Sequence, residues 1–144
     1  MEFHKVVVGF DGSPASRAAL TASLGIVRPS VPITVVCVEE ALPQYVAMRG
    51  EVDEAKQAAD DYFERIGREA IDEAKLHGRE IEIEVLRGHA AQKIVEFARK
   101  EHADLIVIGH SGHSSVWGTF LGTTADKIVR HAACSVLVVR PIEQ

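Results

Sequence analysis

Short runs of apolar, mostly β-branched residues alternate along this chain with segments that have a helical pattern. The runs at residues 5–10, 33–38, 105–108 and 135–140 are apolar nearly throughout, as expected of strands buried on both faces of a sheet. A further run, at residues 81–85, alternates isoleucine and valine with glutamate, which is typical of an edge strand with one face in water. The alternation predicts an α/β fold in which a five-stranded parallel sheet carries helices on both faces.

The segments between the strands carry helix signals. Ser13 is expected to cap a helix over residues 15–28, with Pro14 at its first position. The apolar side of this helix is predicted to hold Ala18, Ala19, Ala22 and Ile26. Residues 51–76 repeat apolar side chains every three or four positions, which predicts a long amphipathic helix after a loop at residues 39–50. Further helices are expected at residues 89–102 and 123–131.

The stretch from Asp104 to Asp126 combines a buried strand, a loop punctuated by glycines and the start of a helix. Thr123 and Asp126 have the spacing of a capping box, which predicts that Thr123 caps this helix. Backbone N–H groups and the positive end of a helix dipole attract anions, so the stretch suggests a phosphate site. Glycine-rich loops also join strands to helices in proteins that bind nothing there, and the pattern alone leaves both possibilities open.

Two familiar phosphate loops are absent from the sequence. No G-x-x-x-x-G-K-[ST] occurs, because there is no lysine between Lys100 and Lys127, and no G-x-G-x-x-G follows the first strand. The 144 residues suit a single domain spanning 1–144, and the net charge of −5 does not favour a nucleic-acid or membrane partner. Cys37 and Cys134 lack zinc-site spacing, and with no leader-like N-terminus we expect a cytoplasmic protein with reduced thiols.

Gly109 and Gly112, followed after nine residues by Gly122 and Thr123, match the pattern G-x2-G-x9-G-[ST]. With VVVGFDGS near the start, a long central helix and SVLVVR at the end, the whole chain resembles the universal stress protein family, and specifically its ATP-binding branch. The resemblance implies a Rossmann-like sheet in the order 3-2-1-4-5. It also implies a stress-response function and a homodimer, formed in many members through the last strand, here residues 135–140.

The same resemblance implies a site for ATP, or another adenine nucleotide, with Mg²⁺ or Mn²⁺ bridging the phosphates. Adenine would bind the main chain of Val38, and Asp11 would lie by the ribose and phosphates. The full set of implied binding residues is Gly9, Asp11, Val38, Ile108, Gly109, Gly112, Gly122, Thr123 and Thr124.

Several of these residues have a purely structural interpretation as well. Asp11 and Gly12 could form only a turn, Thr123 could be only a helix cap, and His110 and His113 lack a third metal ligand. The loop contains no carboxylate to position water and no lysine or arginine to take up charge in a transition state, so binding is favoured over catalysis. The sequence thus predicts an ATP-binding regulatory protein read by an unknown protein partner, with a slow ATPase as the alternative.

Overall fold

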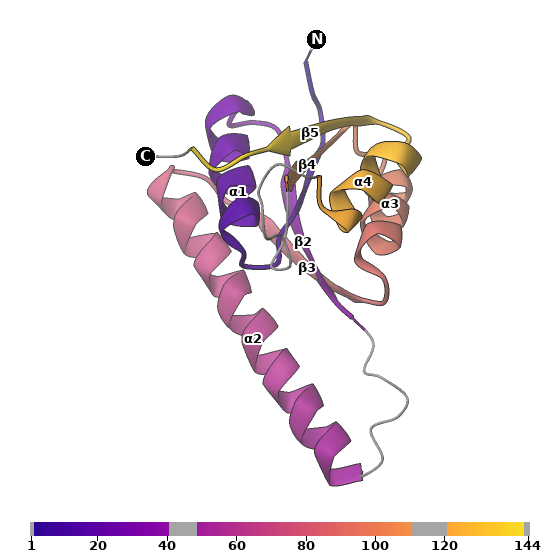
Figure 1. Cartoon of the computed structure of the whole chain (residues 1–144). Helices are drawn as coiled ribbons and strands as arrows, with labels where there is room; N and C mark the ends of the chain where they lie inside the picture. Colours follow the sequence, from indigo (N-terminus) through magenta and orange to yellow (C-terminus); the bar gives the residue numbers. More distant parts are fainter. Residues whose placement is uncertain (1, 41–48, 111–120, 143–144) are drawn as a thin grey trace.

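The computed structural model describes residues 2–40, 49–110 and 121–142, and it contains the expected parallel sheet (Figure 1). The strands lie in the order β3-β2-β1-β4-β5 and every neighbouring pair is parallel, which confirms the predicted 3-2-1-4-5 topology. Their bounds are β1 (Val6–Gly9), β2 (Ile33–Glu39), β3 (Glu82–Arg87), β4 (Leu105–Gly109) and β5 (Ser135–Val139).

Helices cover both faces of the sheet, with α1 and α2 on one side and α3 and α4 on the other (Figure 1). Alternate strand residues therefore enter two separate cores. Val6, Val8 and Val35 pack towards α1 and α2, whereas Val7 and Val36 pack towards α3 and α4. The helix bounds are α1 (Pro14–Ile26), α2 (Arg49–Leu76), α3 (Ala90–Lys100) and α4 (Thr123–His131).

Helix α1 begins as predicted, because the Ser13 side chain accepts a hydrogen bond from the Ser16 amide and Pro14 occupies the first turn. The predicted buried side was wrong at Ile26, which is 62% exposed. The buried face instead carries Ser16 and Ser23 among Ala15, Ala19, Leu20 and Leu24. Both serine hydroxyls donate to main-chain carbonyls of the preceding turn, so they can face the sheet without leaving a polar group unsatisfied.

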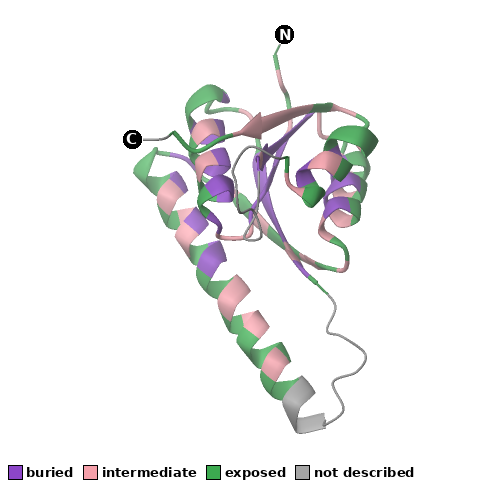
Figure 2. Cartoon of the chain, viewed as in Figure 1, coloured by how far each residue is buried: buried purple, intermediate pink, exposed green. Residues whose placement is uncertain are grey.

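Helix α2 is long, and only its second half packs on the sheet. Its buried apolar side chains are Ile66, Ala70 and Ala74, while the first half of the helix extends beyond the strands (Figures 1 and 2). The helix begins at Arg49, two residues before the predicted start. Most of the loop predicted over residues 39–50 lies outside the described residues, and Glu39 itself is the last residue of β2.

The order of the strands leaves β3 and β5 at the two edges of the sheet. The edge position predicted for β3 is thus confirmed, although the strand ends at Arg87 rather than at Val85. Val85 points to the α2 side and is 45% exposed, since α2 does not cover this end of the edge strand fully. Because all the strands are parallel, their carboxyl ends lie side by side along one end of the sheet, which we call the carboxyl edge. Parallel α/β proteins bind their ligands there.

Candidate functional site

Strand β1 is shorter than its neighbours at the carboxyl edge. The Phe10 amide donates to the Val36 carbonyl at 2.9 Å, and the β1–β2 ladder ends at the pair Gly9–Val36. Main-chain groups two residues apart on a strand face the same side, so the N–H and C=O of Val38 face past the end of β1. The same holds for Gly109, because β4 pairs with β1 only as far as Val107. Polar main-chain groups of two strands therefore face the turn that follows β1.

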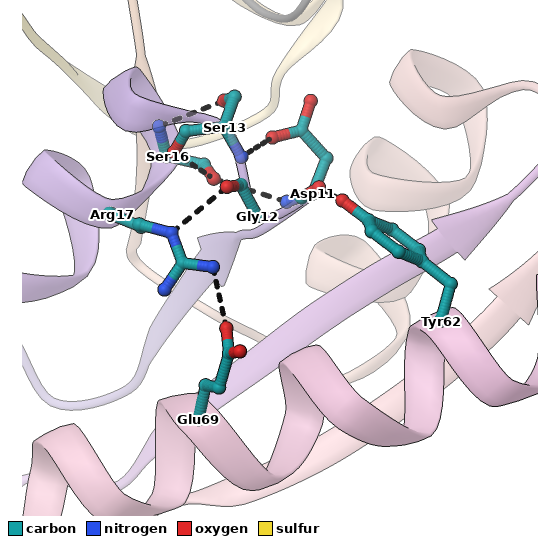
Figure 3. Close-up of polar contacts among 7 residues, drawn as sticks. All are labelled: Asp11, Gly12, Ser13, Ser16, Arg17, Tyr62 and Glu69. Atoms are coloured by element: carbon teal, nitrogen blue, oxygen red, sulfur yellow. Dashed lines mark hydrogen bonds and ion pairs between the residues drawn. The ribbon is translucent and has the colours of Figure 1, made fainter.

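That turn is a compact, internally bonded unit of Asp11, Gly12 and Ser13 (Figure 3). The Asp11 carboxylate accepts from the Ser13 amide at 2.9 Å, which is the Asx turn anticipated as its structural role. Gly12 has φ +80°, a left-handed conformation that favours glycine. The Asp11 amide donates to the Ser16 hydroxyl at 3.2 Å and so joins the turn to the first turn of α1.

Gly9 and Gly109 are glycines for reasons of packing. A Cβ on Gly109 would lie 2.6 Å from the main-chain carbonyl carbon of Ala15, so α1 can approach β4 only because this side chain is absent. A Cβ on Gly9 would lie 3.1 Å from the Ile94 side chain of α3. The fold alone thus accounts for both residues, whatever else they contact.

Helix α4 begins at the same edge. The Gly122 amide donates to the His110 carbonyl at 2.9 Å, and Gly122, with φ −61° and ψ 154°, is the cap of the helix. The predicted capping box was wrong, because this bond turns the chain into the helix one residue before Thr123. Thr123 and Thr124 are exposed in the first turn, where α-helices leave N–H groups without intrahelical acceptors. Since the amide of Gly122 is already used, an anion would meet the residues after it.

The structure brings most of the predicted site residues to one edge of the sheet. Ile108 is 5% exposed and packs in the core beneath α3 and α4, so Gly109 is better placed than Ile108 to meet a ligand. Gly112 and His113 lie outside the described residues. The residues found at or next to the carboxyl edge are Gly9, Asp11, Val38, Ile108, Gly109, Gly122, Thr123 and Thr124.

A pocket of about 560 Å³ extends this edge between α3 and α4, a volume suited to a small molecule. It includes Thr123 and Thr124 from the predicted site and adds side chains that the sequence did not single out, among them Lys127. The described residues that line it are Glu40, His89, Ala90, Ala91, Gln92, Val95, Glu96, Thr123, Thr124, Lys127 and His131.

Two further residues reach the turn after β1 from a distance. The Tyr62 hydroxyl of α2 donates to the Asp11 carbonyl, and Arg17 Nε donates to the Gly12 carbonyl at 2.9 Å (Figure 3). Sequence reasoning missed both, because Tyr62 fitted the apolar stripe of its helix and no pattern links it to Asp11. Burial, and then the charge of Asp11, raise the pKa of Tyr62 above its ordinary value, so its hydroxyl remains a donor in alkaline as well as in neutral solution.

Within residues 2–40, 49–110 and 121–142, no group of three or more histidine, cysteine, aspartate or glutamate side chains could hold a metal ion. Over the same ranges, no helix is both long and apolar enough to span a bilayer.

The parallel sheet with helices on both faces makes this chain a doubly wound α/β protein. In this class of proteins, ligand sites lie at the carboxyl edge of the sheet. The profile of the universal stress protein family matches residues 2–140, and the chain belongs to this family.

Individual relatives are similar over nearly the full length. A universal stress protein of Thermus aquaticus is 35% identical, with 96% of this chain and 99% of the relative covered. One from Methanocaldococcus jannaschii is 31% identical, with coverages of 96% and 82%. Among solved structures, a universal stress protein in complex with cAMP is 29% identical, with a TM-score of 0.75 and coverages of 99% and 100%.

Proposed function

We propose that this chain binds an adenine nucleotide at the carboxyl edge of its sheet, as a member of the ATP-binding branch of its family. The observation that carries the proposal is the early end of β1, which leaves main-chain groups of Val38 and Gly109 facing the Asp11 turn. A main-chain N–H and C=O side by side can pair with the edge of adenine. A relative 29% identical in sequence binds cAMP, a ligand of the same chemical class.

In this proposal the nucleotide extends from Val38 past Asp11 and Gly109 to the start of α4. Thr123 and Thr124 meet the phosphates with their amides and exposed hydroxyls, with Gly9 and Ile108 at the same ends of the strands. The part of Gly112 in the site is proposed from the family resemblance alone. Mg²⁺ or Mn²⁺, held mainly by the phosphates, would offset their negative charge. Nucleotide binding then alters a surface that a second copy of the chain or a regulatory partner recognises.

A slow ATPase at the same site is the second candidate, and Lys127 is the observation that favours it. The loop itself has no lysine or arginine, but Lys127 lies one turn into α4 and lines the same pocket as Thr123 and Thr124. A cation there could stabilise charge that develops on a phosphate. Phosphate release from Mg-ATP distinguishes the candidates: a binding protein should release none, release well below about 1 s⁻¹ would indicate the slow ATPase, and turnover of about 1 s⁻¹ or more would contradict both.

Gly122→Val tests the binding proposal, measured by calorimetry with AMP and Mg-ATP. The backbone conformation of Gly122 is open to any residue, so the variant should fold. Its branched side chain would occupy phosphate space, and we expect affinity to fall by about 4 kcal/mol, or a thousandfold. Identifying any nucleotide that copurifies with the protein is the complementary experiment.

Gly25→Val is the matched control, because a Cβ on Gly25 has no neighbour within 4 Å and that residue is exposed on α1. This variant should bind like the wild type. If Gly122→Val folds and binds AMP and Mg-ATP with wild-type affinity, the loop only connects β4 to α4, and the proposal is contradicted.

A further inference from the structure

The turn after β1 has two bonded main-chain carbonyls, that of Asp11 facing Tyr62 of α2 and that of Gly12 facing Arg17 of α1. The first accepts from the Tyr62 hydroxyl and the second from Arg17 (Figure 3). A Cβ on Gly12 would lie only 2.6 Å from the Tyr62 hydroxyl oxygen, so the turn and the tyrosine are in close contact. Helix α2 therefore touches the proposed nucleotide site from the side opposite α3 and α4.

Tyr62 is itself held in place. Its ring lies edge-on to Phe63, with ring centres 5.2 Å apart, and the guanidinium of Arg65 lies 5.3 Å from its centre. These contacts restrict the rotation of the ring and keep the hydroxyl directed at Asp11. The tyrosine is a fixed donor, and not a surface side chain that happens to reach the turn.

A second connection runs in parallel, two helical turns further along α2. Glu69 forms an ion pair with Arg17, the residue that donates to the Gly12 carbonyl. The hydrogen bond from Arg17 lowers the pKa of the Glu69 carboxyl, so the pair is charged at neutral pH. Tyr62 and Glu69 are seven residues apart and lie on the same face of α2. Helix α2 thus restrains the Asp11 carbonyl directly through Tyr62, and the Gly12 carbonyl indirectly through Glu69 and Arg17 of α1.

We propose that Tyr62, supported by Arg17 and Glu69, is a positioning residue for the nucleotide. By restraining the main chain of Asp11, it keeps the Asp11 side chain and the following turn in the conformation that receives the ligand. A turn that is ordered in advance loses less conformational freedom when the ligand binds. This inference rests on the proposed function and assigns to α2 a part in it that no family pattern in the sequence indicates.

The test is Tyr62→Phe, which removes one hydroxyl and keeps the ring. Loss of one hydrogen bond should weaken AMP binding about fivefold in calorimetry. The fold should survive, because Ile66, Ala70 and Ala74 still anchor α2. Asp61→Asn is the matched control, since Asp61 is exposed on α2 and its carboxylate accepts a hydrogen bond from Gln57 of the same helix. We expect this control to bind AMP like the wild type.

A double-mutant cycle separates positioning from general stabilisation. If Tyr62 acts through Asp11, Tyr62→Phe should change affinity less than twofold in an Asp11→Asn background. Hydrogen exchange of the Ser13 amide, measured without nucleotide, should be several times faster in Tyr62→Phe than in the control. Glu69→Gln provides a second variant, with a smaller loss of affinity expected.

The outcomes are distinguishable. Wild-type affinity in Tyr62→Phe, or equal losses in both backgrounds of the cycle, would overturn the positioning role and leave the proposed function standing. Absence of nucleotide binding by the wild-type protein would overturn the proposed function together with this inference.

Discussion

Individual residues in this protein are constrained most strongly where main chains approach one another. Gly109 has no room for a Cβ because α1 packs directly on the end of β4, and Gly12 adopts a left-handed conformation against Tyr62. Cys37 shows the same tight packing in β2, where it is fully buried beneath α1 and α2. Burial, and then the charge of Asp11, raise the pKa of Cys37 to about 12.

That shift predicts a loss of stability at alkaline pH. The unfolded chain releases the Cys37 proton near its ordinary pKa of 9.0, whereas the folded protein keeps it until about pH 12. Cys37 therefore does not lower the free energy of unfolding below pH 9, where the thiol is protonated in both states. The free energy of unfolding then falls as the pH rises from 9 towards 12. At pH 10 the loss should be about 1.4 kcal/mol, measured by urea unfolding.

Cys37→Val removes the ionisable group and keeps an apolar side chain of similar size. The difference in unfolding free energy between wild type and variant should then shrink or reverse between pH 8 and pH 10. Parallel curves across this range would show that Cys37 contributes nothing to the pH dependence.

At the scale of elements, the helices are joined to the sheet by a few polar contacts between distant segments. Arg79, which follows α2, is 7% exposed and donates to the carbonyls of Val27 and Val31, on either side of the turn between α1 and β2. Arg79 thereby fixes the end of α2 at the amino edge of the sheet, while Tyr62 and Glu69 join α2 to the carboxyl edge. The packed half of α2 is thus held at one end by a guanidinium and at the other by a hydroxyl and an ion pair.

Arg79→Met should destabilise the protein by about 3 kcal/mol, because two buried carbonyls lose a charged donor. The long apolar side chain keeps the packing, so the loss reports mainly on the hydrogen bonds. Arg68→Met is the control: Arg68 is paired with Glu64 on the exposed face of α2, and its loss should change stability by less than about 0.5 kcal/mol. Urea unfolding of both variants measures the difference, and equal effects would contradict the role given to Arg79.

At the scale of the whole molecule, the sheet has one edge at β3 and the other at β5. The His110 amide donates to the Val139 carbonyl, so the main-chain groups of Val139 face β4. Those of Val138 then face the open edge, because successive residues of a strand point to opposite sides. Such an edge can pair with a second copy of itself, and we predict a homodimer through residues 135–140.

Val138→Pro should convert this dimer to a monomer in light scattering, since proline removes a donor from the open edge. The side chain of Val138 packs partly against the α3 and α4 core, so an apolar replacement is better suited than a charged one. Val85→Lys on β3 alters the opposite edge and should leave the dimer intact. A dimer that persisted in Val138→Pro, with the fold verified by circular dichroism, would place the interface elsewhere.

The sequence by itself determined the positions of most helices and strands and the ends of the strands at which polar residues gather, because these follow from the local periodicity of neighbouring residues. The strand order was implied by the resemblance of the whole chain to its family. The strand at residues 105–108 and the helix over residues 123–131 were predicted to within one residue. Even the turn at Asp11 was foreseen as an alternative, because an aspartate beside a glycine bonds to its own main chain.

Only the tertiary structure decided which groups meet across the chain. Ile26 is exposed because Ser16 and Ser23 satisfy their hydroxyls locally and take the buried face of α1. Gly122 caps α4 because its amide finds the His110 carbonyl, twelve positions earlier. Tyr62 reaches Asp11 across 51 positions. Such contacts depend on where separate elements come to lie in space, and the periodicity of one segment contains no information about the surface of another.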